Sequence, residues 1–262
     1  MATQSLVIIL FSAAVLSGVA ACVYFLFRKE NPALLVLVVE KIGVAPDSSH
    51  LKKEWVPLKS LEKTLEHLIK KNFSFISLAD LKNKKKLPVK PVLLCFMGGY
   101  QTVYTQALPL LKKHNLKACL FLSPRFVDGY NECQSPDEEP WQNMLTAKQL
   151  KYLQTSKLFS FGAMGLNRKD LSLLPTGETL FELTESAFRL KKLFKLSIDG
   201  FAWNCGLKKH EEKLTNLCQK LEKLPFITFQ KGINSPKERQ ILRSIHLGKN
   251  LTFAALQIFK QR

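Results

Sequence analysis

The chain has 262 residues, of which 46% are hydrophobic and 10% aromatic, which excludes a disordered protein and is enough for one sizeable α/β domain. Its 39 basic and 21 acidic residues give a net charge of +18, which favours anionic partners such as lipid headgroups, acidic glycans or nucleic acid. A generally lysine-rich composition explains the same charge, and we give it slightly more weight. Because the basic residues form no aromatic-interleaved motif, we predict no specific nucleic-acid partner.

An uncharged segment near the N-terminus predicts a membrane anchor. Leu6 to Phe27 contain no charged residue, and about 20 apolar residues suffice for a helix to cross a bilayer. A cleavable signal peptide has its basic residues before the apolar segment, whereas here Arg28 and Lys29 follow it. We therefore expect a single-pass membrane protein whose N-terminal helix binds the membrane.

The boundaries and the orientation of this anchor depend on the residues within and after the apolar segment. "VAAC", which ends at Cys22, is similar to a lipoprotein cleavage sequence, but it lacks a preceding basic region and the apolar segment continues beyond it. We assign residues 1–30 to an uncleaved anchor and 31–262 to the folded domain. The basic pair after the anchor places that domain in the cytoplasm by the positive-inside rule.

Beyond the anchor, continuous apolar segments alternate with amphipathic helical ones. Strands are predicted at residues 33–39, 73–78, 92–97, 117–122, 158–164, 198–204, 226–229 and 244–248. Helices are predicted at residues 60–71, with Ser60 as the N-cap, and at 79–86, 103–115, 146–154, 178–194, 210–222 and 252–261. This alternation indicates parallel βα units, in a barrel or a doubly wound sheet. With about seven strands, we favour an α/β fold of the incomplete (β/α)7 barrel type.

The segments that follow three of these strands form the natural place for a site. In parallel α/β folds, functional groups gather at the carboxyl ends of the strands. The segments Met97–Tyr100, Ala163–Arg168 and Trp203–Gly206 all lie there. The long polar loop at residues 125–143 is expected to be a surface insertion near the same barrel mouth. Yet the first segment, "MGGY", carries no acid, base or nucleophile.

The six cysteines are widely spaced and include no C-x-x-C pair, which gives no support to a zinc ribbon or a thioredoxin-type site. Cys95, Cys119 and Cys205 fall in or at the ends of apolar strands, where a free cysteine is usually a small core residue. A disulfide framework is not expected at this spacing.

Three motifs carry a family resemblance. "PVLLCFMGGYQTVYTQALPLLKKHNLKACLFL" resembles the first motif of the polysaccharide deacetylases (the NodB-homology domain of carbohydrate esterase family four), where the strand ends T-F-D-D-G-Y. "FSFGAMGLNRKDLSLL" is similar to the second motif, G-S-H-T-x-x-H-x-D-L, and "GFAWNCG" to the third, F-R-x-P-Y-G. The likeness covers most of residues 33–206 and implies a barrel of the polysaccharide deacetylase kind.

The resemblance implies metal-assisted hydrolysis, and it also shows which groups are missing. In the family an Asp and two His bind a divalent ion, usually zinc, while a second Asp is the base and a distal His the acid. The base falls on Met97, the Asp ligand on Gly98, and the His ligands on Met164 and Arg168. The arginine of the third motif falls on Ala202. We therefore expect the metal to be lost and no other cofactor to replace it.

The retained residues are those of a scaffold. Gly99, Tyr100, Trp203 and Gly206 are expected to shape the pocket, because glycine permits the tight turns that leave the strands. Only His246 is a candidate for the distal histidine, although we favour a strand histidine that is hydrogen-bonded in the core.

The sequence leaves three functional hypotheses open. The first is a catalytically inactive, membrane-anchored deacetylase-like protein that binds a glycan or serves as a scaffolding subunit in cell-envelope polysaccharide metabolism. The family implies an extracytoplasmic domain, against the positive-inside rule. The second is an active hydrolase of carbon–nitrogen bonds (N-acetyl, non-peptide) with a divergent site around His246, Asp199 and Cys205. The third is a basic module that binds an anionic surface.

Overall fold

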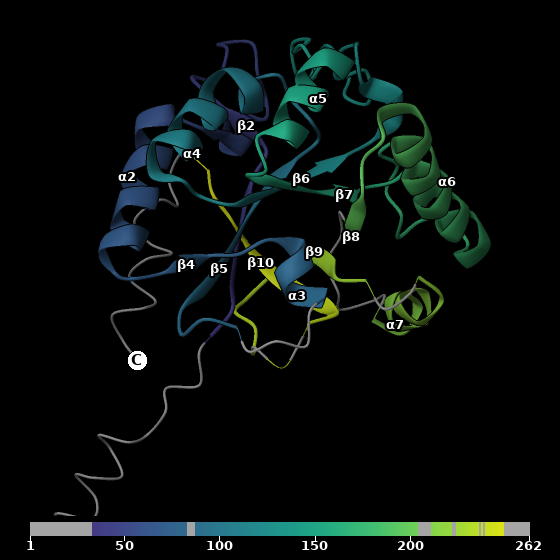
Figure 1. Cartoon of the computed structure of the whole chain (residues 1–262). Coiled ribbons are helices and arrows are strands. Elements are labelled where there is room, and N and C mark those ends of the chain that lie inside the picture. The colour runs from purple at the N-terminus through teal and green to yellow at the C-terminus, as the bar shows by residue number, and fades with distance from the viewer. Residues whose placement is uncertain are drawn as a thin grey trace, which may run out of the picture. The chain divides into compact units, whose positions relative to one another are not determined.

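A closed ring of parallel strands is the centre of this computed structural model, which describes residues 33–82, 87–203, 211–221, 224–235, 237 and 239–248 (Figure 1). Going round the ring, the strands follow the order β1, β10, β9, β8, β7, β6 and β5, and β5 pairs with β1 again. The ring closes at β1, because Leu37 of this strand is in register with Ile245 of β10 on one side and with Leu94 of β5 on the other. The seven strands are β1 (Leu35–Val39), β5 (Pro91–Met97), β6 (Ala118–Leu122), β7 (Phe159–Ala163), β8 (Ile198–Trp203), β9 (Phe226–Lys231) and β10 (Ile241–His246).

Alternate residues of each strand belong to two separate hydrophobic clusters. Val36 and Cys95 point into the ring and join the interior cluster, whereas Leu35 and Leu94 join the cluster that lies beneath the helices. Because side chains alternate between the two faces of a strand, a strand that is buried on both faces must be apolar throughout. This explains why segments such as "LVLVV" and "ACLFL" are continuously hydrophobic and completely buried.

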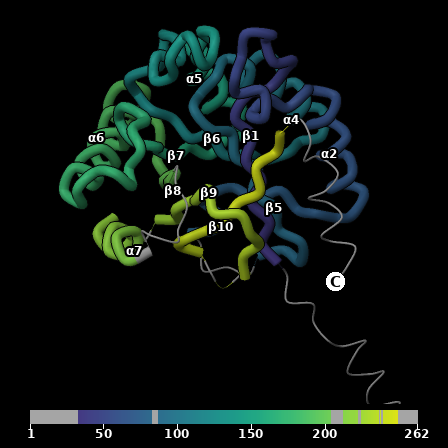
Figure 2. Tube along the Cα trace, turned by 180° about the vertical axis from the view of Figure 1, so that it is seen from behind, coloured from purple at the N-terminus to yellow at the C-terminus, as the bar shows by residue number. Residues whose placement is uncertain are grey.

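Helices surround the ring, and a short helix closes its amino end. Figures 1 and 2 show the larger helices outside the strands from opposite sides. Leu78 and Leu81 of the short helix α3 pack into the interior cluster, where they close the barrel below the strands. The helices are α2 (Leu58–Lys70), α3 (Leu78–Lys82), α4 (Leu108–His114), α5 (Ala147–Thr155), α6 (Thr176–Phe194) and α7 (Glu211–Lys220).

The remaining elements are short. The strands β2 (Lys41–Ile42) and β3 (Trp55–Val56) pair with each other, and β4 (Ser74–Phe75) pairs with the start of β5. Single turns of helix occur at Lys52–Glu54 and Pro124–Phe126, and a π-helical turn at Val103–Ala107 leads into α4.

The predicted seven-stranded barrel of the deacetylase kind is confirmed, and the long elements fall close to their predicted positions. Ser60 is wrong as an N-cap, because α2 already begins at Leu58, directly after Pro57, whose fixed φ suits a helix start. The strand predicted at 73–78 is also wrong beyond Phe75. Ser77 and Asp80 form a reciprocal cap, in which Asp80 accepts from the Ser77 amide and Ser77 accepts from the Asp80 amide, so α3 starts there instead.

Several predictions lie outside the described residues. These are the membrane anchor in 1–30, the end of the helix predicted at 79–86, and the helix predicted at 252–261. Among the residues that the structure describes, no helix has both the length and the hydrophobicity to cross a membrane.

Candidate functional site

The carboxyl ends of the strands meet the loops at one end of the barrel, which we call the barrel mouth. The turn after β5 is held there by the long loop that starts at residue 125, since the Leu145 amide donates to the Gly99 carbonyl at 2.8 Å and the Gln101 amide to the Asn143 carbonyl at 2.9 Å. Gly99 has a φ of +82°, and a Cβ atom on it would lie 2.5 Å from Cδ2 of Leu122. The loop therefore lies at the mouth, as expected, and glycine is required in the turn.

Apolar packing occupies three of the positions to which the sequence resemblance assigned the family's chemistry. Met97 ends β5, Met164 follows β7, and Ala202 lies near the end of β8. All three are buried and belong to the interior cluster, in contact with the core of the barrel. Residues from three different strands therefore meet, as the parallel topology predicts, but they meet as hydrophobic side chains that can neither bind a hard metal ion nor accept a proton.

Arg168 fills the space beside Gly98. Gly98 has a φ of +90°, and a Cβ atom on it would lie 2.9 Å from Nη1 of Arg168 and 2.9 Å from Cε2 of Tyr100. Arg168 is partly buried. Nη1 donates to the Tyr100 hydroxyl at 3.4 Å, and the guanidinium lies 5.8 Å from the centre of the Tyr100 ring. A permanent cation thus occupies the place that a side chain at position 98 would enter.

Glu40 is the anionic group that faces this cation. It directly follows β1, and its side chain is 12% exposed. Burial raises the pKa of Glu40, and Glu54 adds to this, whereas the positive charges of Arg168 and Lys41 lower it. Burial by itself would lower the pKa of Arg168, but its neighbours Tyr100 and Glu40 outweigh that effect and raise it, so Arg168 stays charged.

A second buried cation supports the other side of Tyr100. Lys41 is only 1% exposed, and its Nζ lies 2.5 Å from a Glu54 carboxylate oxygen and 5.6 Å from the centre of the Tyr100 ring. Burial raises the pKa of Tyr100, although Arg168 and Lys41 both lower it, so the phenol remains protonated at neutral pH. Tyr100 therefore makes cation–π contacts with two cations, Lys41 and Arg168.

His246 ends β10 and lies at the same end of the barrel. Its Nδ1 is 4.0 Å from Oε1 of Glu40, and its ring packs edge-on against Phe229 with 4.2 Å between ring centres. Its Nε2 is buried and makes no hydrogen bond within the described part of the chain. Burial lowers the pKa of His246 to about 4, so the ring is neutral at pH 7. The hydrogen bond that we expected for a core histidine is absent at Nε2.

The other predicted residues lie away from this group. Trp203, which we expected beside the pocket, is fully buried in the cluster beneath the helices, and its ring lies 5.6 Å from Nζ of Lys213 on α7. Asp199 is at the start of β8, at the opposite end from the mouth, where it pairs with Lys82 at 3.4 Å. Cys205 and Gly206 lie outside the described residues.

Sequence reasoning missed Glu40 and Glu182. Glu182 is buried on α6, where it accepts hydrogen bonds from the amides of Leu166 and Asn167 at 2.7 and 3.0 Å and so fixes the loop that carries Arg168. Glu40 is detectable in the sequence as a carboxylate directly after a buried strand. Glu182 is detectable as an acidic residue on the apolar face of a helix. Asp170 caps the turn after Arg168, as predicted, by accepting from the Ser172 amide at 2.9 Å.

The comparisons with known proteins agree with this architecture. The family model for polysaccharide deacetylases matches residues 84–226, and the chain therefore belongs to the polysaccharide deacetylase family. No curated protein matches the chain.

Solved structures show the same fold at low sequence identity. The deacetylase PplD of Streptococcus pyogenes, solved in complex with acetate, has 20% identity and a TM-score of 0.68 over 86% of this chain and 97% of that one. IcaB of Ammonifex degensii has 19% identity and a TM-score of 0.70 over 88% and 98%. BC0361, a polysaccharide deacetylase of Bacillus cereus, has 18% identity and a TM-score of 0.66 over 85% and 68%.

The residues at the barrel mouth do not fit the family's divalent metal. Gly98 offers no side-chain ligand, and the thioethers of Met97 and Met164 are poor ligands for a hard or borderline cation. The guanidinium of Arg168 would repel such an ion. No catalytic step through a metal is derived for this mouth.

We predict that Arg168 and Glu40 are energetically coupled. Arg168→Met is expected to lower the free energy of unfolding at pH 7 by about 1–3 kcal/mol, because Glu40 then keeps only Lys41 as a nearby cation. In a Glu40→Gln background the same change should cost less, by about 1 kcal/mol. Urea unfolding of the four proteins measures this coupling. Arg189→Met removes an exposed arginine paired with Glu185 and should cost under about 0.5 kcal/mol. Additive effects at positions 168 and 40 would contradict the coupling.

His246 should make the protein less stable in mild acid. The unfolded chain binds a proton on this residue below its ordinary pKa of 6.5, whereas the folded chain does so only near 4. The free energy of unfolding should therefore fall as the pH drops from about 6.5 to 4, and His246→Gln should reduce this fall. Urea titrations across this range measure it. The exposed His50 provides the control, since His50→Gln should keep the wild-type slope; equal slopes for all three proteins would disprove the prediction.

Proposed function

We propose that this chain is a membrane-anchored member of the polysaccharide deacetylase family that has lost hydrolysis and acts as a glycan-binding or scaffolding subunit in cell-envelope polysaccharide metabolism. The observation that carries the proposal is the guanidinium of Arg168 beside Gly98. It supports a loss of function that goes beyond one missing ligand, because a cation and two packed methionines take the place of base and metal together. The N-terminal uncharged segment supports the anchor.

One alternative has a specific observation in its favour. Glu40 and His246 lie 4.0 Å apart at the mouth, and burial shifts the pKa of each toward its neutral form. Such a pair could exchange a proton with a substrate, so a hydrolase of N-acetyl bonds with a divergent site is the second candidate. Its weakness is that, within the described part of the chain, Arg168 is the group near the pair that is able to activate a carbonyl, and it already donates to the Tyr100 hydroxyl.

The surface beside the mouth supports glycan binding rather than a deep substrate pocket. A pocket of about 100 Å³ lies next to Lys41 and is lined by the amide side chains of Gln101, Gln142 and Asn143, which suit sugar hydroxyls. Small-molecule sites usually measure roughly 300–1,000 Å³. We therefore infer a shallow contact with part of a larger glycan.

An exposed aromatic pair extends this surface. Trp141, 59% exposed, directly precedes the amide residues of the pocket, and its ring stacks on Tyr130 with 5.6 Å between centres and 27° between planes. Exposed aromatic rings offer apolar faces on which sugar rings can stack, and such patches commonly mark binding sites. The pair therefore supports a binding role that requires no catalytic group.

The activity prediction separates the two candidates. The full chain, supplied with zinc, should release no acetate from N-acetylglucosamine oligomers. A variant with Met97→Asp, Gly98→Asp, Met164→His and Arg168→His restores the family's base and ligands, and it should bind one more zinc ion per chain than the wild type. Arg168→His alone is the control and should bind no additional zinc. Acetate release by the wild type that stops after His246→Gln would instead establish the divergent hydrolase.

A glycan-binding role predicts a local effect of Trp141. Trp141→Ala should weaken binding of N-acetylglucosamine oligomers by about tenfold, because stacked aromatic contacts contribute about 1 kcal/mol or more. Calorimetric titration of the full chain measures it. Phe181 on α6 is equally exposed, at 59%, and Phe181→Ala should leave the affinity unchanged. A similar loss in both variants would indicate non-specific hydrophobic adsorption.

A further inference from the structure

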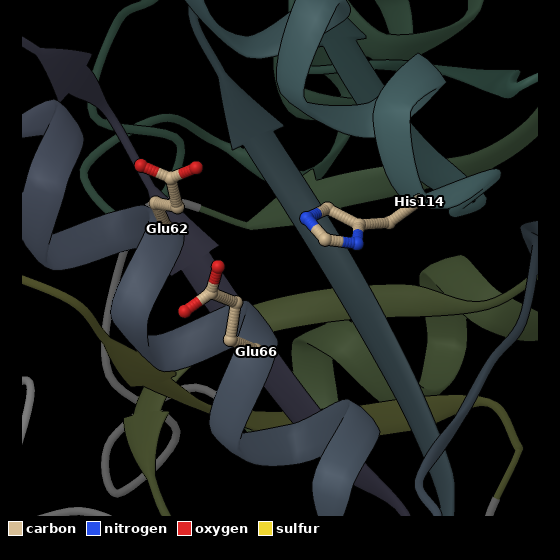
Figure 3. Close-up of side chains that lie close together, drawn as sticks. All are labelled: Glu62, Glu66 and His114. Carbon is tan, nitrogen blue, oxygen red and sulfur yellow. The ribbon is translucent and has the colours of Figure 1, made fainter.

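Three metal-ligating side chains converge on the outer surface of the barrel, away from the mouth. Glu62 and Glu66 are one turn apart on α2, and His114 is the last residue of α4. One ligand atom from each of the three lies within 4.8 Å of the others. Figure 3 shows the two carboxylates on one face of α2, with the imidazole ring reaching toward them from the neighbouring helix.

The imidazole of His114 has an unsatisfied nitrogen in this group. The residue is half-buried, but its Nε2 atom is inaccessible to solvent and makes no hydrogen bond with any part of the chain that the structure describes. Sequence reasoning expected a solvated histidine on a helix surface. Because buried polar atoms nearly always have a partner, an inaccessible nitrogen that has none points to a missing one. A bound cation would satisfy it.

The charges of the group also fit a cation. Lys113 approaches Glu62, with Nζ 2.9 Å from Oε1, and this contact lowers the pKa of the Glu62 carboxyl. The Lys113 side chain is 58% exposed, so it can turn into solvent. Glu66 forms no ion pair among the described residues. The two carboxylates carry two negative charges, which match a divalent ion, and the carboxyl end of α4 adds a favourable dipole.

We propose that Glu62, Glu66 and His114 bind a divalent transition-metal ion, of which zinc is the representative, and that this ion links α2 to the end of α4. One imidazole and two carboxylates are a donor set that zinc accepts, with water completing the coordination. Ligand atoms around a tetrahedral zinc ion lie about 3.4 Å apart, so rotation of surface glutamates must shorten the present separations, which are at most 4.8 Å, by up to about 1.4 Å.

This site is independent of the degenerate mouth. Leu65 of α2 and Leu111 of α4 belong to the cluster between the helices and the strands, so the two helices already pack against the outside of the barrel. The metal would sit on their outer faces, whereas the family's chemistry belongs to the carboxyl ends of the strands. Its role is therefore to join two helices, and the proposal stands whether or not the mouth is active.

Zinc titration of the metal-free full chain tests the proposal. We expect one zinc ion per chain and a zinc-dependent rise in the melting temperature, since a ligand that binds only the folded state stabilises it. His114→Gln and Glu66→Gln should each weaken zinc binding at least about tenfold. His67→Gln changes a histidine of α2 that is not in the group, and this variant should bind zinc as the wild type does. Absence of zinc binding in the wild type, or binding that survives His114→Gln, would overturn the proposal.

Two further variants separate this site from the mouth and test the competing cation. Arg168→Met should leave the zinc affinity unchanged. If Arg168→Met alters the zinc affinity and His114→Gln does not, the zinc ion lies at the mouth and the proposal fails. Lys113→Met removes the ammonium that pairs with Glu62 and should tighten zinc binding about two- to fivefold. Lys63→Met on the exposed side of α2 is the matched control; equal affinities for the two lysine variants would contradict the assigned position of the metal.

Discussion

The guanidinium of Arg168, which lies beside the Cα atom of Gly98, is the contact around which the rest of the barrel mouth is arranged. It requires a residue without a side chain at position 98, a ring at Tyr100 on which to lie, and a carboxylate at Glu40 to balance its charge. A side chain at position 98 would clash with Arg168. Without Tyr100 or Glu40, the charge of Arg168 would lose a compensating neighbour. These residues at the barrel mouth are therefore a mutually consistent group.

The frame around this group explains how the chemistry can change while the fold persists. The ring of strands is closed by backbone hydrogen bonds and filled by hydrophobic side chains, and Met97 and Met164 at its mouth belong to the same interior cluster. The loop that carries Arg168 is held from outside the barrel, by the carboxylate of Glu182 on α6. Fold and site are thus stabilised by different residues.

Each strand has one face inside the barrel and one face beneath the helices, and these two regions of the molecule have different roles. The interior cluster and the mouth belong to the ring, whereas the outer helices face solvent and can carry features unrelated to the family's reaction. The group of Glu62, Glu66 and His114 is such a feature, since it combines residues of two helices that are adjacent only because both pack on the barrel.

The sequence by itself determined the alternation of strands and helices, the barrel class and the positions of the altered motif residues, because apolar segments, glycines and motif spacing are local properties. It misplaced Ser60 and the strand after Phe75, where proline and a local cap override the general pattern. Only the tertiary structure decided that Arg168 lies against Gly98 and that Glu40 faces it. These residues follow different strands, and their proximity depends on how the closed ring brings the carboxyl ends of its strands together.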